Sequence, residues 1–248
     1  MQFIKLVGVA TLTFALVITN TACEQSFKIK DISNHPVVEK QNVVPLQFKD
    51  VIIENTINEI NENKVQEILK QHNVGDNKFI IFVDKEDTDN FHGGVIIGNK
   101  IYDFGIVSMM GNLDDLYSFQ ELDIYEKRLV KIQGAMGANY APTNYYLIDN
   151  NVPQLFLHTE GHTQELDIDK DGVKEIVTSV PGGVTTSIEI YEYNNEKFSM
   201  VDINETLKAV SVYLEDNSII NVYFNDQQSN SIKFEYTENE LREIISII

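Results

Sequence analysis

The segment Gln-Glu-Leu-Asp-Ile-Asp-Lys-Asp-Gly-Val-Lys-Glu-Ile-Val occupies residues 164–177. Its three aspartates stand at alternate positions and are followed by Gly172, which permits a sharp bend because it has no Cβ. Such a loop turns several oxygens toward one point, and calcium takes about six to eight oxygen ligands. The segment therefore predicts a calcium-binding loop between two strands. Its predicted ligands are the carboxylates of Asp167, Asp169, Asp171 and Glu175 and the backbone carbonyl of Val173.

The residues that follow the loop argue against an EF-hand. An EF-hand closes with a glutamate at loop position 12, where this chain has Thr178, and Glu175-Ile176-Val177 favours a strand over a helix. The segment from about Gln154 to Val201 resembles the strand–loop–strand calcium site of FG-GAP and VCBS-type repeats, including its Pro181-Gly182-Gly183. That resemblance implies a structural calcium ion that rigidifies a β-sheet. An acidic, solvated hairpin without an ion is the alternative.

The first 22 residues have the features of an export signal. Lys5 precedes an apolar run from Leu6 to Ile18 that is too short to span a bilayer. The run ends in Thr19-Asn20-Thr21-Ala22-Cys23, which resembles the lipobox of bacterial lipoproteins, with Asn20 where that family usually has an aliphatic residue. The resemblance implies that Cys23 is acylated (palmitate) and anchors the protein on the extracytoplasmic face of the cell membrane. A plain secretory signal with an incidental cysteine is the alternative.

Composition restricts the classes of partner. The chain has 248 residues, 38 Asp and Glu against 19 Lys and Arg, and a formal charge of −19. Such an acidic surface repels phosphate backbones, so no nucleic-acid partner is expected. The single cysteine excludes a disulfide framework and a thiolate metal cluster. If Cys23 is acylated, the processed chain also has no cysteine nucleophile.

The N-terminal part combines predicted helices and strands. Residues 23–46 are polar and predict a flexible tether. From Val51 to His72 the apolar residues recur at helical spacing, which predicts one kinked helix or two short ones. Lys78–Val83 predicts a buried strand, and Gly94–Phe104 predicts a hairpin that turns at Gly98-Asn99. Residues 47–140 are therefore expected to form an α/β region with a small sheet.

Short strand patterns dominate the chain from residue 141 onward. Asn194-Asn195 and Asp216-Asn217 tolerate positive φ and predict tight hairpins. Thr237-Glu238-Asn239-Glu240 resembles a capping box, which predicts a terminal helix that buries Leu241, Ile244 and Ile248. Residues 141–248 are thus expected to form a β-rich region of antiparallel hairpins, partly like a propeller blade, with a C-terminal helix. The predicted fold class is α+β.

Three weaker patterns have chemical interpretations. His158-Thr159-Glu160-Gly161-His162 could place two imidazoles around a zinc ion, although histidines in turns usually face solvent. Residues 84–90 could form a second cation loop, with an exposed acidic turn as the favoured alternative. The C-terminal aromatic residues could form a carbohydrate-stacking face, but aromatic residues in strands usually belong to a core. No nucleophile elbow, Walker A loop or dinucleotide fingerprint is present.

Together these patterns predict a membrane-anchored extracytoplasmic lipoprotein whose β-rich module is stabilised by calcium. A non-enzymatic binding or scaffold role is expected, with a cell-envelope polymer or a protein as the possible ligand. The alternative is an exported hydrolase of cell-wall polymers or peptides that uses carboxylates or the pair His158 and His162. That alternative requires an enclosed pocket with convergent polar groups.

Overall fold

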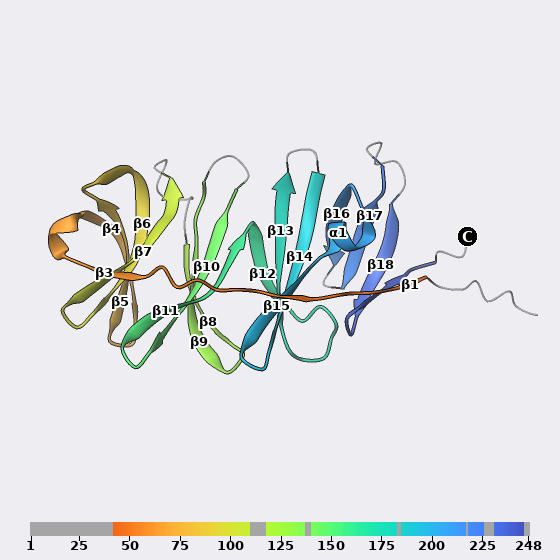
Figure 1. Cartoon of the computed structure of the whole chain (residues 1–248), viewed down its shortest axis with the longest axis horizontal. Coiled ribbons are helices and arrows are strands. Elements are labelled where there is room, and N and C mark those ends of the chain that lie inside the picture. The colour runs from red at the N-terminus through yellow and green to blue at the C-terminus, as the bar shows by residue number, and fades with distance from the viewer. Residues whose placement is uncertain are drawn as a thin grey trace, which may run out of the picture. The chain divides into compact units, whose positions relative to one another are not determined.

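The computed structural model describes residues 42–109, 118–136, 140–182, 185–216, 218–225 and 231–245 (Figure 1). The chain divides into two compact units, Met1–Glu39 and Lys40–Ile248, and all described residues belong to the second. The predicted export signal, Cys23 and most of the predicted tether lie outside the described residues.

The described residues form four sheets, each built on four consecutive strands that turn back antiparallel to one another. The first sheet contains β4 (Val65–Val74), β5 (Asn77–Asp84), β6 (Asp87–Ile97) and β7 (Lys100–Met109). The second contains β8 (Ser118–Ile124), β9 (Lys127–Gln133), β10 (Pro142–Asp149) and β11 (Val152–Glu160). The third contains β12 (His162–Leu166), β13 (Glu175–Gly182), β14 (Thr185–Asn194) and β15 (Lys197–Asp202). The fourth contains β16 (Ser211–Asp216), β17 (Ile219–Tyr223), β18 (Ile232–Thr237) and β19 (Glu240–Glu243).

The segment before β4 adds a fifth strand to three of the four sheets. β1 (Val43–Pro45) pairs with β19, β2 (Lys49–Asp50) with β15, and β3 (Asn58–Ile60) with β7. Figure 1 shows this segment, in orange, running past the sheets. A short 3₁₀ turn (Glu62–Lys64) then leads into β4, and one α-helix, α1 (Ile203–Leu207), links the third and fourth sheets. Within the described residues the second sheet keeps only four strands, and residues 51–57, which we call the strap, pass it without strand pairing.

Three hydrophobic clusters lie between successive sheets. One joins the first and second sheets and includes Phe104 and Tyr146, whose rings stack with centroids 3.9 Å apart. The next joins the second and third sheets and includes Tyr145. The last joins the third and fourth sheets and contains Ile168 from the predicted calcium loop. Neighbours along a strand face opposite sides, so Tyr145 and Tyr146 each enter a different cluster.

The predicted α+β class is wrong, because the described residues are almost entirely antiparallel strands. The helical segment predicted from Val51 to His72 is instead the unpaired strap, β3, the 3₁₀ turn and most of β4. Two bulges in the pairing of β4 with β5 interrupt its two-residue alternation. Val65, Ile68 and Leu69 therefore stand at helix-like spacing in a strand, where Ile68 is exposed and Leu69 is half-buried.

The predicted C-terminal helix is also wrong over its described part. Glu238 and Asn239 both have positive φ, 38° and 65°, and form the two-residue turn between β18 and β19. That conformation makes a hairpin turn whose twist matches the strands it joins. Leu241 is buried as expected, but from a strand, in the cluster between the third and fourth sheets.

Candidate cation sites

The loop between β12 and β13 gathers three of the five predicted calcium ligands. Leu166 and Glu175 pair across the base of the hairpin, which brings the two ends of the loop together. Each of Asp167, Asp169 and Glu175 offers a carboxylate oxygen, and these oxygens lie within 4.8 Å of one another. Asp171 is exposed and does not belong to this group of carboxylates, and Val173, whose predicted ligand atom is its backbone carbonyl, is also exposed.

Backbone N–H groups hold the loop through the same carboxylates. Asp169 Oδ1 accepts from the N–H of Asp171 at 3.1 Å, and Asp167 Oδ2 accepts from the N–H of Gly172 at 3.2 Å. Glu175 Oε2 accepts from the N–H of Ile168 at 3.0 Å. Gly172 has φ +92°, in the region that favours glycine. Backbone N–H groups of the loop thus donate hydrogen bonds to the loop's own carboxylates, which stabilises its conformation.

Glu175 is buried and Asp167 and Asp169 are half-buried, and no ion pair to any of the three is found among the described residues. Asp167 Oδ1 is buried and has no hydrogen-bond partner in the described part of the chain. Burial raises the pKa of Asp169, and the negative charges of Asp171 and Asp167 add to that effect. Glu175 is only 6% exposed. Burial, and then the charges of Asp169 and Asp171, raise the pKa of Glu175 to about 7.

The surroundings add negative charge to the loop. The one lysine between its aspartates, Lys170, extends to Glu235 at 3.4 Å. Glu192 on β14 accepts a hydrogen bond from Tyr236 at 2.9 Å. Burial raises the pKa of Glu192, and the charges of Asp169 and Asp171 raise it further. Glu192 is not recognisable from the sequence as part of this site, because only strand pairing brings β14 next to β13. A bound cation would relieve this concentration of charge.

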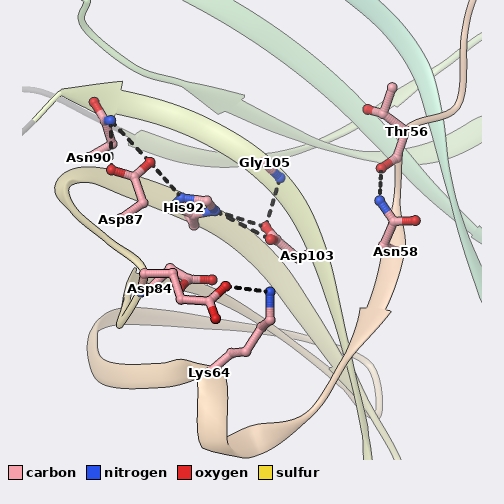
Figure 2. A network of polar contacts seen from close by, with 10 residues as sticks. Thr56, Asn58, Lys64, Asp84, Asp87, Asn90, His92, Asp103 and Gly105 are labelled. Atoms are coloured by element: carbon pink, nitrogen blue, oxygen red, sulfur yellow. Dashed lines mark hydrogen bonds and ion pairs between the residues drawn. The ribbon is translucent and has the colours of Figure 1, made fainter.

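A second cluster surrounds His92 in the first sheet (Figure 2). Its members come from three neighbouring strands: Asp84 ends β5, Asp87 and His92 lie on β6, and Asp103 lies on β7. His92 Nδ1 lies 3.2 Å from Asp103 Oδ1, and Nε2 lies 3.2 Å from Asp87 Oδ2. Potential ligand atoms of Asp84, His92 and Asp103 lie within 4.8 Å of one another.

The contacts of His92 favour an ion-paired imidazolium over a metal ligand. A carboxylate only accepts hydrogen bonds, so contacts at both ring nitrogens require a proton on each, and no lone pair is left for a metal. Burial by itself would lower the pKa of His92. The hydrogen bonds and charges of Asp103, Asp87 and Asp84 outweigh burial and raise it. The segment 84–90 therefore supplies partners to a charged histidine.

His158 and His162 do not converge on a shared ligand position. His158 lies on β11, with Nδ1 2.7 Å from Asn144 Oδ1 on β10. His162 begins β12 and pairs with Ser179 of β13. Neither histidine belongs to a potential metal group in the described part of the chain. Among the C-terminal aromatic residues, Tyr191, Phe234 and Tyr236 are buried core residues.

No protein-family model, no curated protein and no solved structure matches the chain. Among the described residues, no helix has the length and apolar character needed to cross a membrane. Both candidate sites consequently depend on their own geometry and chemistry.

Proposed function

We propose that the β12–β13 loop binds a calcium ion that stabilises the junction of the third and fourth sheets. The observation that carries this proposal is the buried, unpartnered Asp167 Oδ1 beside the carboxylates of Asp169 and Glu175. A buried carboxylate oxygen without a partner is costly, and a cation supplies the missing interaction.

The donor set favours calcium over a transition metal. The three converging groups are carboxylates, and calcium prefers oxygen ligands, whereas imidazole and thiolate ligands select zinc or copper. Asp171, the carbonyl of Val173 and water can supply the remaining oxygens. Ile168 stands between two of the proposed ligands and is fully buried in the cluster between the third and fourth sheets. An ion that orders the loop would therefore also order this core residue.

The supporting argument for location comes from the N-terminal sequence. The lipobox-like Thr19-Asn20-Thr21-Ala22-Cys23 supports a lipid-anchored protein on the extracytoplasmic face of the membrane. Extracellular calcium modules bind the ion at about 10⁻⁴–10⁻³ M. A site of that affinity is filled outside the cell and empty in the cytosol, so the ion would stabilise the fold after export. We propose that the anchored protein is a non-enzymatic binding or scaffold module.

An exported hydrolase is the competing function. His158 does line a cleft, whose described residues include one carboxylate, Glu54, and one aliphatic hydroxyl, Thr56. The side-chain contacts found for His158 among the described residues are with Asn144 and Glu160, and not with a nucleophile. Nucleophilic catalysis by His158 needs such a partner within hydrogen-bond reach. The binding role is therefore preferred.

The proposed function is tested by calcium-dependent melting of the full chain. Calcium at ten times its dissociation constant should stabilise the protein by about 1.4 kcal/mol, which is measured as a higher melting temperature than in chelator. Asp169→Asn should abolish this difference, whereas Asp76→Asn, an exposed aspartate in the β4–β5 turn, should preserve it. An unchanged melting temperature on chelation of calcium-saturated wild type would refute the calcium site.

The anchor is tested separately. Cys23→Ser should move the protein from the membrane fraction to the soluble fraction and abolish incorporation of labelled palmitate. Continued membrane association and labelling of this variant would exclude a lipid anchor at Cys23.

A further inference from the structure

The second sheet is open at an edge where the other three sheets are closed. Their last strands, β7, β15 and β19, pair antiparallel with β3, β2 and β1 of the N-terminal segment. β11 is the last strand of the second sheet, and among the described residues no strand pairs with it on that side. The strap passes nearby, but no backbone hydrogen bond between the strap and β11 is found within the described part of the chain.

Backbone groups at the start of β11 face this open edge. Antiparallel strands alternate between hydrogen-bonded pairs and pairs whose N–H and C=O groups point away from each other. Asp149 and Val152 flank a two-residue turn and are therefore a hydrogen-bonded pair. Counting on from Val152, the backbone groups of Pro153 and Leu155 point away from β10. Pro153 has no N–H to donate, so Leu155 is the first residue that can both donate and accept at the edge.

The same orientation recurs beyond the bulge in β11. The N–H of Gly161 donates to the carbonyl of Ala141 at 2.9 Å, directly after the paired residues of β10 and β11. Counting back from that bond, the backbone groups of Glu160 and His158 point outward. Both residues are also exposed. The stretch from Leu155 to Glu160 therefore offers unpaired backbone groups to a further strand.

Two clefts distinguish β11 from the other open edges, which are the first strands β4, β8, β12 and β16 among those that the structure describes. One cleft, of about 470 Å³, reaches β7 of the first sheet, and the other, of about 550 Å³, reaches β14 and β15 of the third. Val51 and Ile53 of the strap and Leu155 of β11 line both clefts. Successive side chains of a strand point to opposite faces, so a strand added along β11 directs them alternately toward the two clefts.

The two clefts differ in polarity. Phe104, Ile106 and Tyr146 form an apolar wall in the first cleft. Two large apolar side chains that line it are exposed to solvent, Ile106 at 43% and Ile52 at 87%. Grouped exposed apolar side chains are typical of interaction sites. The charged residues that line the second cleft are Lys127, Asp149, Glu196 and Lys197. The first cleft thus favours apolar side chains and the second favours polar ones.

We propose that β11 binds an extended segment of a partner protein as a fifth, antiparallel strand. The segment alternates apolar and polar residues, with its apolar side chains in the first cleft. Its net charge is positive, because the chain carries a formal charge of −19. The same charge disfavours a second copy of this chain as the occupant. The strap has to shift to admit the strand, and this movement breaks no backbone hydrogen bond found between the strap and β11.

This inference rests on the proposed binding role and names the class of partner. It does not rest on the calcium ion, because the β12–β13 loop contributes no residue to either cleft. A negative result for calcium-dependent melting and a negative result for peptide binding are therefore independent of each other.

The test uses a fluorescent peptide with blocked ends, Lys-Val-Thr-Val-Thr-Val-Lys, titrated with the full chain and followed by fluorescence anisotropy. The peptide Lys-Val-Val-Thr-Thr-Val-Lys has the same composition without the alternation and should bind about tenfold more weakly. N-methylation of the valines blocks one edge of the peptide strand, and N-methylation of the threonines blocks the other. At least one of these two peptides should also bind about tenfold more weakly, because backbone hydrogen bonds are lost.

Three results would overturn the proposal. The first is failure of the parent peptide to bind. The second is unchanged affinity of the shuffled peptide or of both N-methylated peptides. The third is a dimer of the free chain that the peptide dissociates, since a second copy would then be the occupant of β11.

Matched variants locate the bound peptide. His158→Pro removes an outward-facing N–H, whereas His158→Ala removes the same side chain and keeps the N–H, so only the first should weaken binding, by about tenfold. Ile106→Trp narrows the first cleft and should weaken binding; the same change at Ile68, equally exposed on β4 and outside both clefts, should not. Melting curves establish which variants are folded, and Ile106→Trp decides if His158→Pro is not. Wild-type affinity of folded Ile106→Trp would place the peptide elsewhere and refute the site.

Discussion

At the residue scale, Glu175 is the most buried carboxylate of the β12–β13 loop. Its neighbours Asp167 and Asp169 are also acidic, and the described residues provide no cation that pairs with the three. Burial and like charges therefore favour the protonated form, which is why the pKa of Glu175 is about 7. Calcium would reverse this effect by favouring the ionised form.

The raised pKa of Glu175 predicts that the stability of the calcium-free protein depends on pH. The folded state binds the Glu175 proton more tightly than the unfolded state, so the free energy of unfolding falls as the pH rises from about 4.5 to about 7. The decrease is expected to reach about 3 kcal/mol. Urea unfolding in chelator should show it, and Glu175→Gln should weaken the pH dependence. Identical pH profiles for the two proteins would contradict this prediction.

The raised pKa of His92 predicts that the free energy of unfolding also depends on pH in a higher range. Its pKa is raised, so the stabilisation by Asp87 and Asp103 is fully present below about pH 6.5 and is lost as the pH rises through the raised pKa. His92→Gln should destabilise the protein more at pH 6 than at pH 9, as measured by urea unfolding at about these two values. His162→Gln, at an exposed position, is the control. An equal cost at both pH values would show that His92 is neutral.

At the element scale, the turn between β18 and β19 shows how one short sequence can support two structures. Thr237 and Glu240 match a capping box, but they pair with each other across a hairpin. Asn239 also contributes its carbonyl, which accepts from the N–H of Leu46 at 2.8 Å. The turn is therefore stabilised by a distant segment that the local pattern does not include.

The hairpin and helix interpretations predict opposite effects of one double substitution. Glu238→Asn with Asn239→Gly supplies the residues that this turn prefers and should stabilise the protein by about 0.5–1 kcal/mol. In a helix, the introduced glycine alone would cost about 1 kcal/mol. Denaturant unfolding of the wild type and the double variant measures whether the free energy of unfolding rises or falls. Destabilisation would argue against the hairpin.

At the scale of the whole molecule, the contact between the second and third sheets includes a buried ion pair. Lys131 on β9 is 5% exposed and donates to Glu165 Oε1 and to the carbonyl of Thr163, both at 2.8 Å. Tyr145 on β10 also donates to Glu165. Buried ion pairs contribute little net stability, but loss of one partner is costly because the other charge remains buried.

Lys131→Met should therefore destabilise the protein by about 3–5 kcal/mol. Adding Glu165→Met should recover part of this loss, because the isolated charge is removed. Equilibrium unfolding compares the free energies of unfolding of the wild type, Lys131→Met and the double variant. If the double variant is no more stable than Lys131→Met, the burial of an unpaired Glu165 is not the cause.

Local sequence predicted some elements well. Lys78–Val83 lies within β5, and Gly98-Asn99 is the turn between β6 and β7. The hairpin predicted at Asn194-Asn195 exists, but its turn residues are Asn195 and Glu196, one position later. These features depend on residues close together in sequence. The strands β1, β2 and β3 were not predicted, because each exists by pairing with a distant strand.

The grouping of Asp167, Asp169 and Glu175 was determined by the sequence itself, since nine consecutive residues contain all three and one hairpin brings them together. Burial of those carboxylates depends on the packing of the third and fourth sheets, which only the tertiary structure shows. Only the tertiary structure also shows that His92 lies between β5 and β7, and that the strap lines a cleft together with β7, β10 and β11. The spacing of apolar residues along the chain indicates which side chains are buried, but strand pairing determines which distant segments cover them. In β4, two bulges interrupt the alternation, so the sequence pattern did not indicate a strand.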